Sequence, residues 1–172
     1  MKAVFAGALV LLTSGAALAV DGTVHFTGQI VDAPCVVAIG SQDQDVNLGQ
    51  VKTLVFSAAG DKSPAQPFQI NLENCVIGST FTKANVSFSG IGDTDNAALL
   101  AIDNQAGAAS GVGIGIYDNT NTLVDLNTGS SETTLRTGQT VLYYTAAYVQ
   151  AGATAVTPGY GDSSVDFNIT YN

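Results

Sequence analysis

The sequence predicts an all-β sandwich formed by a single domain. Three observations support this fold class: short runs of alternating apolar and polar residues, connections rich in turn-forming residues, and no long segment with helical periodicity. Side chains of a strand point alternately to opposite faces, so each alternating run offers one face for burial. Many short strands joined by regular turns are typical of two packed sheets.

The predicted strands can be read from the alternation. They cover residues 23–30, 68–73, 86–89, 112–116, 141–145 and 165–171. The connections between them look like turns, at 60–64, 92–96, 118–121, 128–131 and 157–159. Glycines 111, 113 and 115 fall in one of the strand patterns and no lysine follows them, so they do not predict a phosphate-binding loop. Residues 97–102 fit either a helical turn or a strand.

The first 19 residues have the three parts of a secretory signal peptide. Met1-Lys2 gives a basic start, residues 3–12 are apolar, and Ala17 and Ala19 form an A-x-A-like end. The apolar run is too short to span a bilayer as a helix. The alternative is a buried N-terminal helix, which would not need this three-part pattern. Cleavage after Ala19 would leave residues 20–172 as the mature chain.

The mature chain is strongly acidic. Loss of Lys2 leaves four basic and fourteen acidic residues, a net charge of −10. Such a surface repels nucleic acid and anionic membranes, so we expect neither as a partner. No other apolar run reaches spanning length, and we therefore expect no membrane insertion of the mature chain.

The two cysteines predict one disulfide. A secreted chain with an even number of cysteines is expected to oxidise them, and Cys35 and Cys75 can pair only with each other. Closing this loop stabilises the fold by roughly 4 kcal/mol in the chain-entropy model. The spacing is not the C-x-x-C of a redox site, and two cysteines with the lone His25 are too few for a metal site. We expect no metal and no cofactor.

No set of residues predicts catalysis. His25 lies among the polar positions of the first alternating run and has no partner that would make it a general base. The pairs Asp43/Asp45 and Asp93/Asp95 lack the glycine and glutamate of a calcium-binding EF-hand loop, so we interpret them as turn residues. Aromatic side chains that could stack on sugars are more often core or edge residues; they are Tyr143, Tyr144, Tyr148 and Tyr160.

Several segments, in this order, resemble the pilins of chaperone–usher fimbriae. The sequence Gly28-Gln-Ile-Val-Asp-Ala-Pro-Cys35 has the glycine that this family places seven residues before its first cysteine. An alternating strand runs into the second cysteine, and the chain ends in an alternating strand with a penultimate tyrosine, Tyr171. Leu48–Val51 and Gly111–Asp118 also match. The resemblance covers the whole mature chain and is greatest to type 1 fimbrial major subunits.

The resemblance implies an immunoglobulin-like pilin sandwich that lacks its final strand. It divides the chain into a signal peptide (1–19), an N-terminal donor-strand extension (20–31) and a pilin domain (32–172). In this family a periplasmic chaperone first fills the groove left by the missing strand. At the outer-membrane usher, the extension of the next identical subunit replaces the chaperone, which is a form of strand addition.

The resemblance also assigns roles to residues. The donor strand would present Gly22, Val24, Phe26, Gly28 and Ile30, with Gly28 at the family's small position. The strand beside the acceptor groove would present Val165, Phe167, Ile169 and Tyr171. Residues 22–30 span about 30 Å when extended, enough to run along a sandwich edge. Alternation alone leaves two other interpretations open: an ordinary first strand at 20–31 and an ordinary edge strand at the C-terminus.

The predicted function is that of a non-enzymatic structural subunit of a fimbrium on the bacterial surface, which supports cell adhesion. The alternatives are a minor adaptor subunit or a carbohydrate-binding adhesin of the same fimbrium. Tip adhesins usually add a receptor-binding domain before the pilin domain, and a mature chain of this length has room for one domain.

Overall fold

The computed structural model describes residues 21–28, 30, 33–78 and 80–172. The predicted signal peptide, residues 1–19, lies outside the described residues. The chain divides into two units, Met1–Val31 and Asp32–Asn172. The second contains all helices and strands of the described residues.

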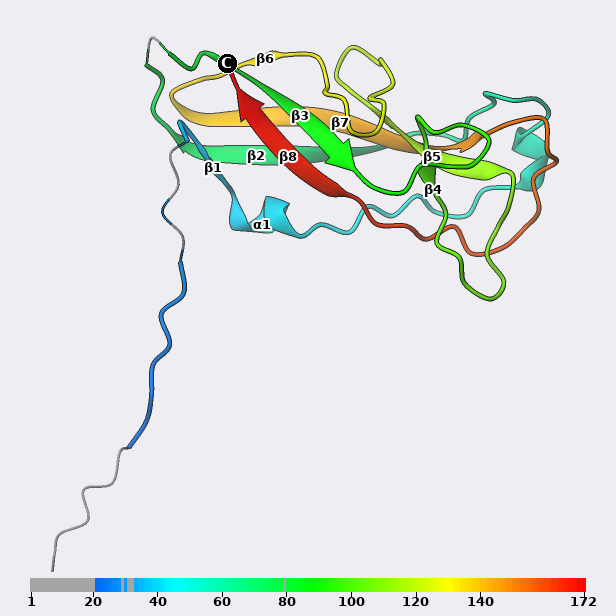
Figure 1. Ribbon diagram of the computed structural model, residues 1–172, viewed down its shortest axis with the longest axis horizontal. Coiled ribbons are helices and arrows are strands. Elements are labelled where there is room, and N and C mark those ends of the chain that lie inside the picture. Colours follow the sequence, from blue (N-terminus) through cyan, green and yellow to red (C-terminus); the bar gives the residue numbers. More distant parts are fainter. Residues whose placement is uncertain (1–20, 29, 31–32, 79) are drawn as a thin grey trace, which may run out of the picture. The chain divides into compact units, whose positions relative to one another are not determined.

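The second unit is an antiparallel β sandwich (Figure 1). One sheet has five strands in the order β1-β2-β7-β5-β4, and the other has three in the order β6-β3-β8. The five-stranded sheet is formed by β1 (Val36–Val37), β2 (Gln66–Cys75), β4 (Leu100–Ala101), β5 (Val112–Tyr117) and β7 (Gly138–Gln150). The three-stranded sheet is formed by β3 (Lys83–Ser89), β6 (Thr133–Thr134) and β8 (Asp166–Tyr171).

Among the residues that the structure describes, helical structure is confined to two short elements. Helix α1 (Ile39–Gln42) follows β1, and a 3₁₀ turn, η1, covers Thr53–Val55. Ser41 of α1 is buried, and its hydroxyl accepts a hydrogen bond from the backbone N–H of Asn71 at 3.0 Å. This bond fixes α1 against β2. Among the described residues no helix is long and apolar enough to cross a membrane.

The core lies between the two sheets, where the alternating strands place their apolar side chains. Ile70, Leu72 and Leu142 come from the five-stranded sheet, and Val86 and Phe88 from β3; each is at most 2% exposed. Three rings also meet here. Phe68 stacks on Tyr144 with ring centroids 5.5 Å apart, and Phe88 meets Tyr144 edge-on at 5.3 Å.

Strand β5 is buried on both faces, and its glycines allow this. A Cβ added at Gly113 would lie 2.8 Å from the Leu99 Cβ and 3.0 Å from the Leu100 carbonyl oxygen. A side chain at this position would therefore separate β5 from the segment that covers it. On this outer face a second apolar cluster forms from Leu99, Tyr117, Ala147, Val149 and Ala151.

The predicted strands within the sandwich are found, and the differences are in extent. The pattern at 141–145 is the middle of β7, which runs through thirteen residues. Of residues 97–102, left open by the sequence, Leu100–Ala101 form strand β4. The glycine-rich segment 111–115 enters β5, as its alternation predicts.

Candidate functional site

Within the described residues, strand β8 has a hydrogen-bonding partner on one side only. It pairs antiparallel with β3 from Ala84↔Tyr171 to Ser89↔Asp166, and it is the last strand of its sheet. No strand of the described residues pairs with its other side. We call this unpaired side, with the inward-facing row Val165, Phe167, Ile169 and Tyr171, the open edge. An edge of this kind presents main-chain N–H and C=O groups that can pair with another strand.

The inward side chains of the open edge are incompletely covered. Val165, Phe167, Ile169 and Tyr171 pack against the core but remain half-buried, while the alternate residues of β8 are exposed. Their partners one strand inward are fully covered: Val86, opposite Ile169, is 0% exposed, and Phe88, opposite Phe167, is 2% exposed. The inward-facing side chains are thus buried in β3 but only half-buried in β8, at the sheet edge. A further strand beside β8 would cover them.

Strand β1 and the loop that follows α1 add half-buried apolar side chains to the same core. Val37, Val46 and Leu48 pack against it without being buried completely. The sequence interpretation assigned them no role, although Val46 and Leu48 show a short alternation that could have drawn attention to them.

The C-terminal end of β8 is fixed from several directions. The Asn172 carbonyl oxygen accepts hydrogen bonds from the backbone N–H groups of Thr82 and Lys83 at 2.7 and 2.9 Å. The Lys83 ammonium lies 2.6 Å from the Glu132 carboxylate, which also accepts a bond from the Asn172 side chain. The Tyr171 hydroxyl lies 3.5 Å from the Cys35 carbonyl oxygen. These contacts hold the open edge in place at this end.

The predicted disulfide is present between Cys35 and Cys75. Both cysteines are buried, at 3% and 2% exposure. Next to them, the Val76 N–H donates to the Pro34 carbonyl oxygen at 2.8 Å. The bridge therefore ties the chain just before β1 to the end of β2.

The N-terminal segment, described at residues 21–28 and 30, is exposed and belongs to no strand. Val24 is 74% exposed, Phe26 92% and Ile30 102%. Around Gly22 and Gly28 an added Cβ would meet no atom within 4 Å. These three apolar side chains are largely exposed to water. A partner that covers them would therefore gain most of the free energy of burying them.

His25 and the aspartate pairs form no catalytic or metal site among the described residues. His25 is exposed. The Asp93 carboxylate accepts hydrogen bonds from the backbone N–H groups of Asp95 and Asn96, which is turn chemistry, as predicted. The described residues contain no group of three His, Cys, Asp or Glu side chains able to hold a metal.

A family model described as "Fimbrial protein" matches residues 24–172. The chain belongs to the fimbrial protein family. It is 60% identical over 173 residues to long polar fimbria protein A of Salmonella typhimurium, covering 99% of this chain and 96% of that protein. It is 40% identical over 169 residues to the type-1 fimbrial protein A chain of Escherichia coli K12, with 93% and 91% coverage.

Solved structures of pilus subunits share the fold of this fimbrial chain. A chaperone–usher pilus subunit superimposes with a TM-score of 0.73 at 29% identity, covering 88% of this chain and 95% of that one. The P pilus rod subunit PapA gives a TM-score of 0.68 at 27% identity, covering 81% and 100%. The prediction of an immunoglobulin-like pilin sandwich is confirmed.

Family membership also settles the class of function. The chain is a structural, non-enzymatic subunit of a chaperone–usher fimbrium on the bacterial surface, where it polymerises with other pilin subunits. Its relatives include a probable major fimbrial subunit of Escherichia coli O157:H7, at 58% identity. They favour a main subunit over the predicted alternatives, an adaptor or an adhesin.

Proposed function

We propose that this fimbrial subunit polymerises by inserting residues 20–31 of one copy beside β8 of the next. The observation that supports the proposal is that the open edge and the N-terminal segment are complementary. The open edge lacks a neighbouring strand over half-buried apolar side chains, and the N-terminal segment presents apolar side chains that nothing covers. Adding a strand to an exposed sheet edge is an established mode of recognition.

Length and energy support this pairing. The six residues of β8 extend over about 20 Å, and residues 22–30 over about 30 Å, so the segment can cover the whole strand. Full burial of Val24, Phe26 and Ile30 contributes about 1.5–3 kcal/mol for each side chain. A ladder of main-chain hydrogen bonds adds to this. Gly28 would let the donor backbone approach closely where the others insert side chains.

Geometry makes the product a filament. The donor segment and the open edge are different surfaces of the same chain, so the contact is heterologous and head-to-tail. A contact of this kind that does not close into a ring continues indefinitely. Domain limits of 20–31 for the donor segment and 32–172 for the pilin domain follow from this arrangement.

The proposal includes a periplasmic chaperone and an outer-membrane usher. Before assembly, the open edge leaves unpaired main-chain groups and apolar side chains exposed, and both promote aggregation. A chaperone that supplies a temporary strand would prevent this. An usher would then exchange that strand for the N-terminal segment of the incoming subunit.

Deletion of residues 20–31 from the mature chain tests the proposal. We expect the truncated subunit to fold with its chaperone, to elute as a chaperone complex in size-exclusion chromatography of periplasmic extracts, and to form no filaments in electron microscopy. Persistence of filaments would show that residues 20–31 are not the donor. Failure to fold with the chaperone would show that they belong to the subunit's own sandwich.

A matched pair of point variants sharpens the test. Phe26→Asp places a charge on the apolar face of the segment, and Thr27→Asp places the same charge on the next residue, which faces the opposite side in a strand. We expect Phe26→Asp to abolish filaments and Thr27→Asp to preserve them. Equal effects would contradict insertion of one face.

A further inference from the structure

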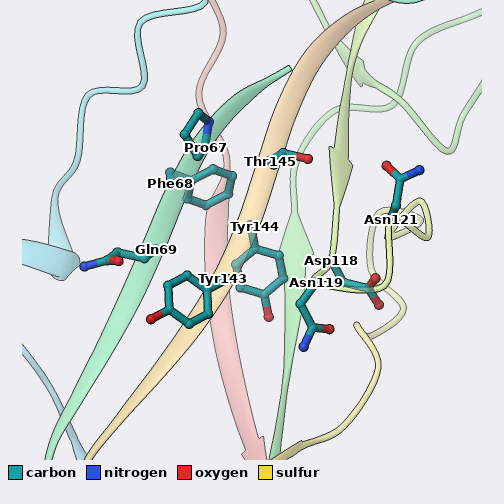
Figure 2. A pocket seen from close by; sticks show the side chains of 9 residues that line it. All are labelled: Pro67, Phe68, Gln69, Asp118, Asn119, Asn121, Tyr143, Tyr144 and Thr145. Carbon is teal, nitrogen blue, oxygen red and sulfur yellow. The ribbon is translucent and has the colours of Figure 1, made fainter. Parts of the chain in front are cut away.

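A hollow of about 540 Å³ lies on the sandwich where β5 stops and β7 continues (Figure 2). Strand β5 ends at Tyr117, opposite Thr145, whereas β7 extends back to Gly138. The turn that follows β5 borders the space so left. Nine residues of β2, β7 and this turn line the hollow: Pro67, Phe68, Gln69, Asp118, Asn119, Asn121, Tyr143, Tyr144 and Thr145. Its volume is within the range of small-molecule sites.

The lining combines an aromatic ring with carboxamides. Tyr143 is 59% exposed, and Gln69 lies opposite it in the register of β2 and β7, on the same face of the sheet. The side chains of Asn119 and Asn121 are exposed and make no hydrogen bond within the described part of the chain. Each carboxamide can donate two hydrogen bonds and accept through its oxygen.

The turn that carries the two asparagines is rigid. The Asp118 carboxylate, 6% exposed, accepts bonds from the N–H and hydroxyl of Thr120 at 2.9 and 2.6 Å, from the Thr122 N–H, and from the N–H and hydroxyl of Ser131. Burial opposes its ionisation, but these donors outweigh burial and hold the Asp118 pKa well below its usual range. Asn121 has a φ of 59°, which asparagine tolerates.

The lining has few charged groups, although the protein as a whole is strongly acidic. Asp118 is the one ionisable carboxylate of the lining, and both of its oxygens are engaged by the turn. No lysine, arginine or glutamate lines the hollow. The lining itself offers an anionic ligand no cation, since the Lys62 ammonium lies over the neighbouring Tyr117 ring, and it offers a cationic ligand no open carboxylate. The chemistry that fits is a neutral molecule with hydroxyls beside apolar C–H faces.

We propose that this hollow is a binding subsite for a neutral saccharide, with the Tyr143 ring stacking on a sugar face and the Asn119 and Asn121 carboxamides bonding its hydroxyls. None of the lining residues belongs to β8 or to residues 20–31. Occupancy therefore does not compete with the proposed assembly. Each site binds weakly, because the hollow is shallow and open, but a filament repeats it in every subunit. Repetition can raise the apparent affinity for a multivalent glycan surface roughly 10²–10⁴-fold.

Saturation-transfer difference NMR on purified filaments tests the subsite, with lactose, maltose and N,N′-diacetylchitobiose as probes. We expect transfer to the ring protons of at least one probe. The signal should fall at least fivefold with Tyr143→Ala and persist with Tyr160→Ala, a control at another exposed tyrosine, 64% exposed and absent from the lining. The double variant Asn119→Ala/Asn121→Gly should weaken binding similarly, since glycine retains the positive φ.

The outcomes separate the two proposals. Electron microscopy first establishes that each variant forms filaments, which bears on assembly alone. Wild-type filaments that transfer no saturation to any probe would overturn the subsite, as would a neighbouring subunit found covering the hollow. An unchanged signal in Tyr143→Ala would overturn it as well. Should Tyr143→Ala fail to assemble, the asparagine double variant decides by the same criterion.

Discussion

Truncation of Phe26 to alanine gives a quantitative prediction for filament stability. The side chain is 92% exposed in the free segment, so its removal costs the unassembled subunit almost nothing. In the proposed filament the ring is buried in the neighbouring subunit. The whole hydrophobic contribution of Phe26 therefore appears in the contact between subunits and not in the folding of the sandwich.

The expected size follows from burial. A fully buried phenylalanine contributes about 3 kcal/mol at the upper end of the usual range. Because about 1.4 kcal/mol corresponds to a factor of ten, Phe26→Ala should speed the dissociation of subunits from filaments by about 100-fold, if the transition state has lost this contact.

The assay is the rate at which filaments in guanidinium chloride release monomers, followed by size-exclusion chromatography. Thr27→Ala is the control, since Thr27 is an exposed polar neighbour on the other face. We expect the control to dissociate at the wild-type rate. Equal rates for Phe26→Ala and wild type would refute the placement of Phe26 in the contact, and equal acceleration by both variants would refute the one-sided insertion.

Three further predictions concern the sandwich itself. Replacing both cysteines of the Cys35–Cys75 bridge by alanine should lower the free energy of unfolding by roughly 4 kcal/mol in urea melts of chaperone-free subunits; an unchanged midpoint would argue against the bridge as a stabiliser. Gly113→Ala should cost about 1–3 kcal/mol through overpacking against Leu99, while Gly40→Ala, in open space, should not destabilise; equal melting temperatures would contradict the close packing of β5. Because the folded protein lowers the pKa of Asp118, the stabilisation by its ionised carboxylate is complete above the unfolded pKa of about 3.9 and is lost as pH falls toward the folded value. Asp118→Asn should therefore lower the free energy of unfolding by about 2 kcal/mol near neutral pH and should flatten the loss of stability below pH 4. An acid melt of this variant with the wild-type slope would exclude this role.

The sequence predicts those strands whose large apolar side chains all lie on one face. Alternation identified the segments of β2, β3 and β8 because each packs one row of side chains into the core, and it identified β5 because glycines occupy the second buried face of that strand. It underestimated β7, since Ala146 and Ala147 are both buried, one against the core between the sheets and the other in the outer cluster. Burial on both faces removes the alternating signal.

The shortest elements leave no signal from which a strand can be assigned. Strands β1, β4 and β6 have two residues each, too few for a period of two to be recognised. They exist because longer partners hold them: Val36 and Val37 pair with Glu73 and Leu72 of β2. These strands form only through tertiary contacts, so a local pattern in the sequence could not predict them.

The sequence shows the apolar rows of the candidate site but not the open edge. The apolar rows at 24–30 and 165–171 are visible as alternation, which is the same in a paired strand and an unpaired one. What distinguishes β8 is that no strand of the described residues lies on its other side, beside Phe167 and Ile169, which is a property of sheet order. Val37 and the turn at Asn119 and Asn121 were not assigned roles, because their positions depend on where other strands end.

The disulfide determines how a pulled filament would carry load. Tension on the proposed donor segment enters the sandwich at Cys35, immediately before β1, which is held to β2 by two register pairs. Strand β1 alone would peel away pair by pair. The covalent link passes the force to Cys75 at the end of β2, which is joined to β7 by nine register pairs. Force along β2 loads all of these pairs at the same time. The disulfide therefore makes the attachment of the donor segment to the sandwich resistant to pulling.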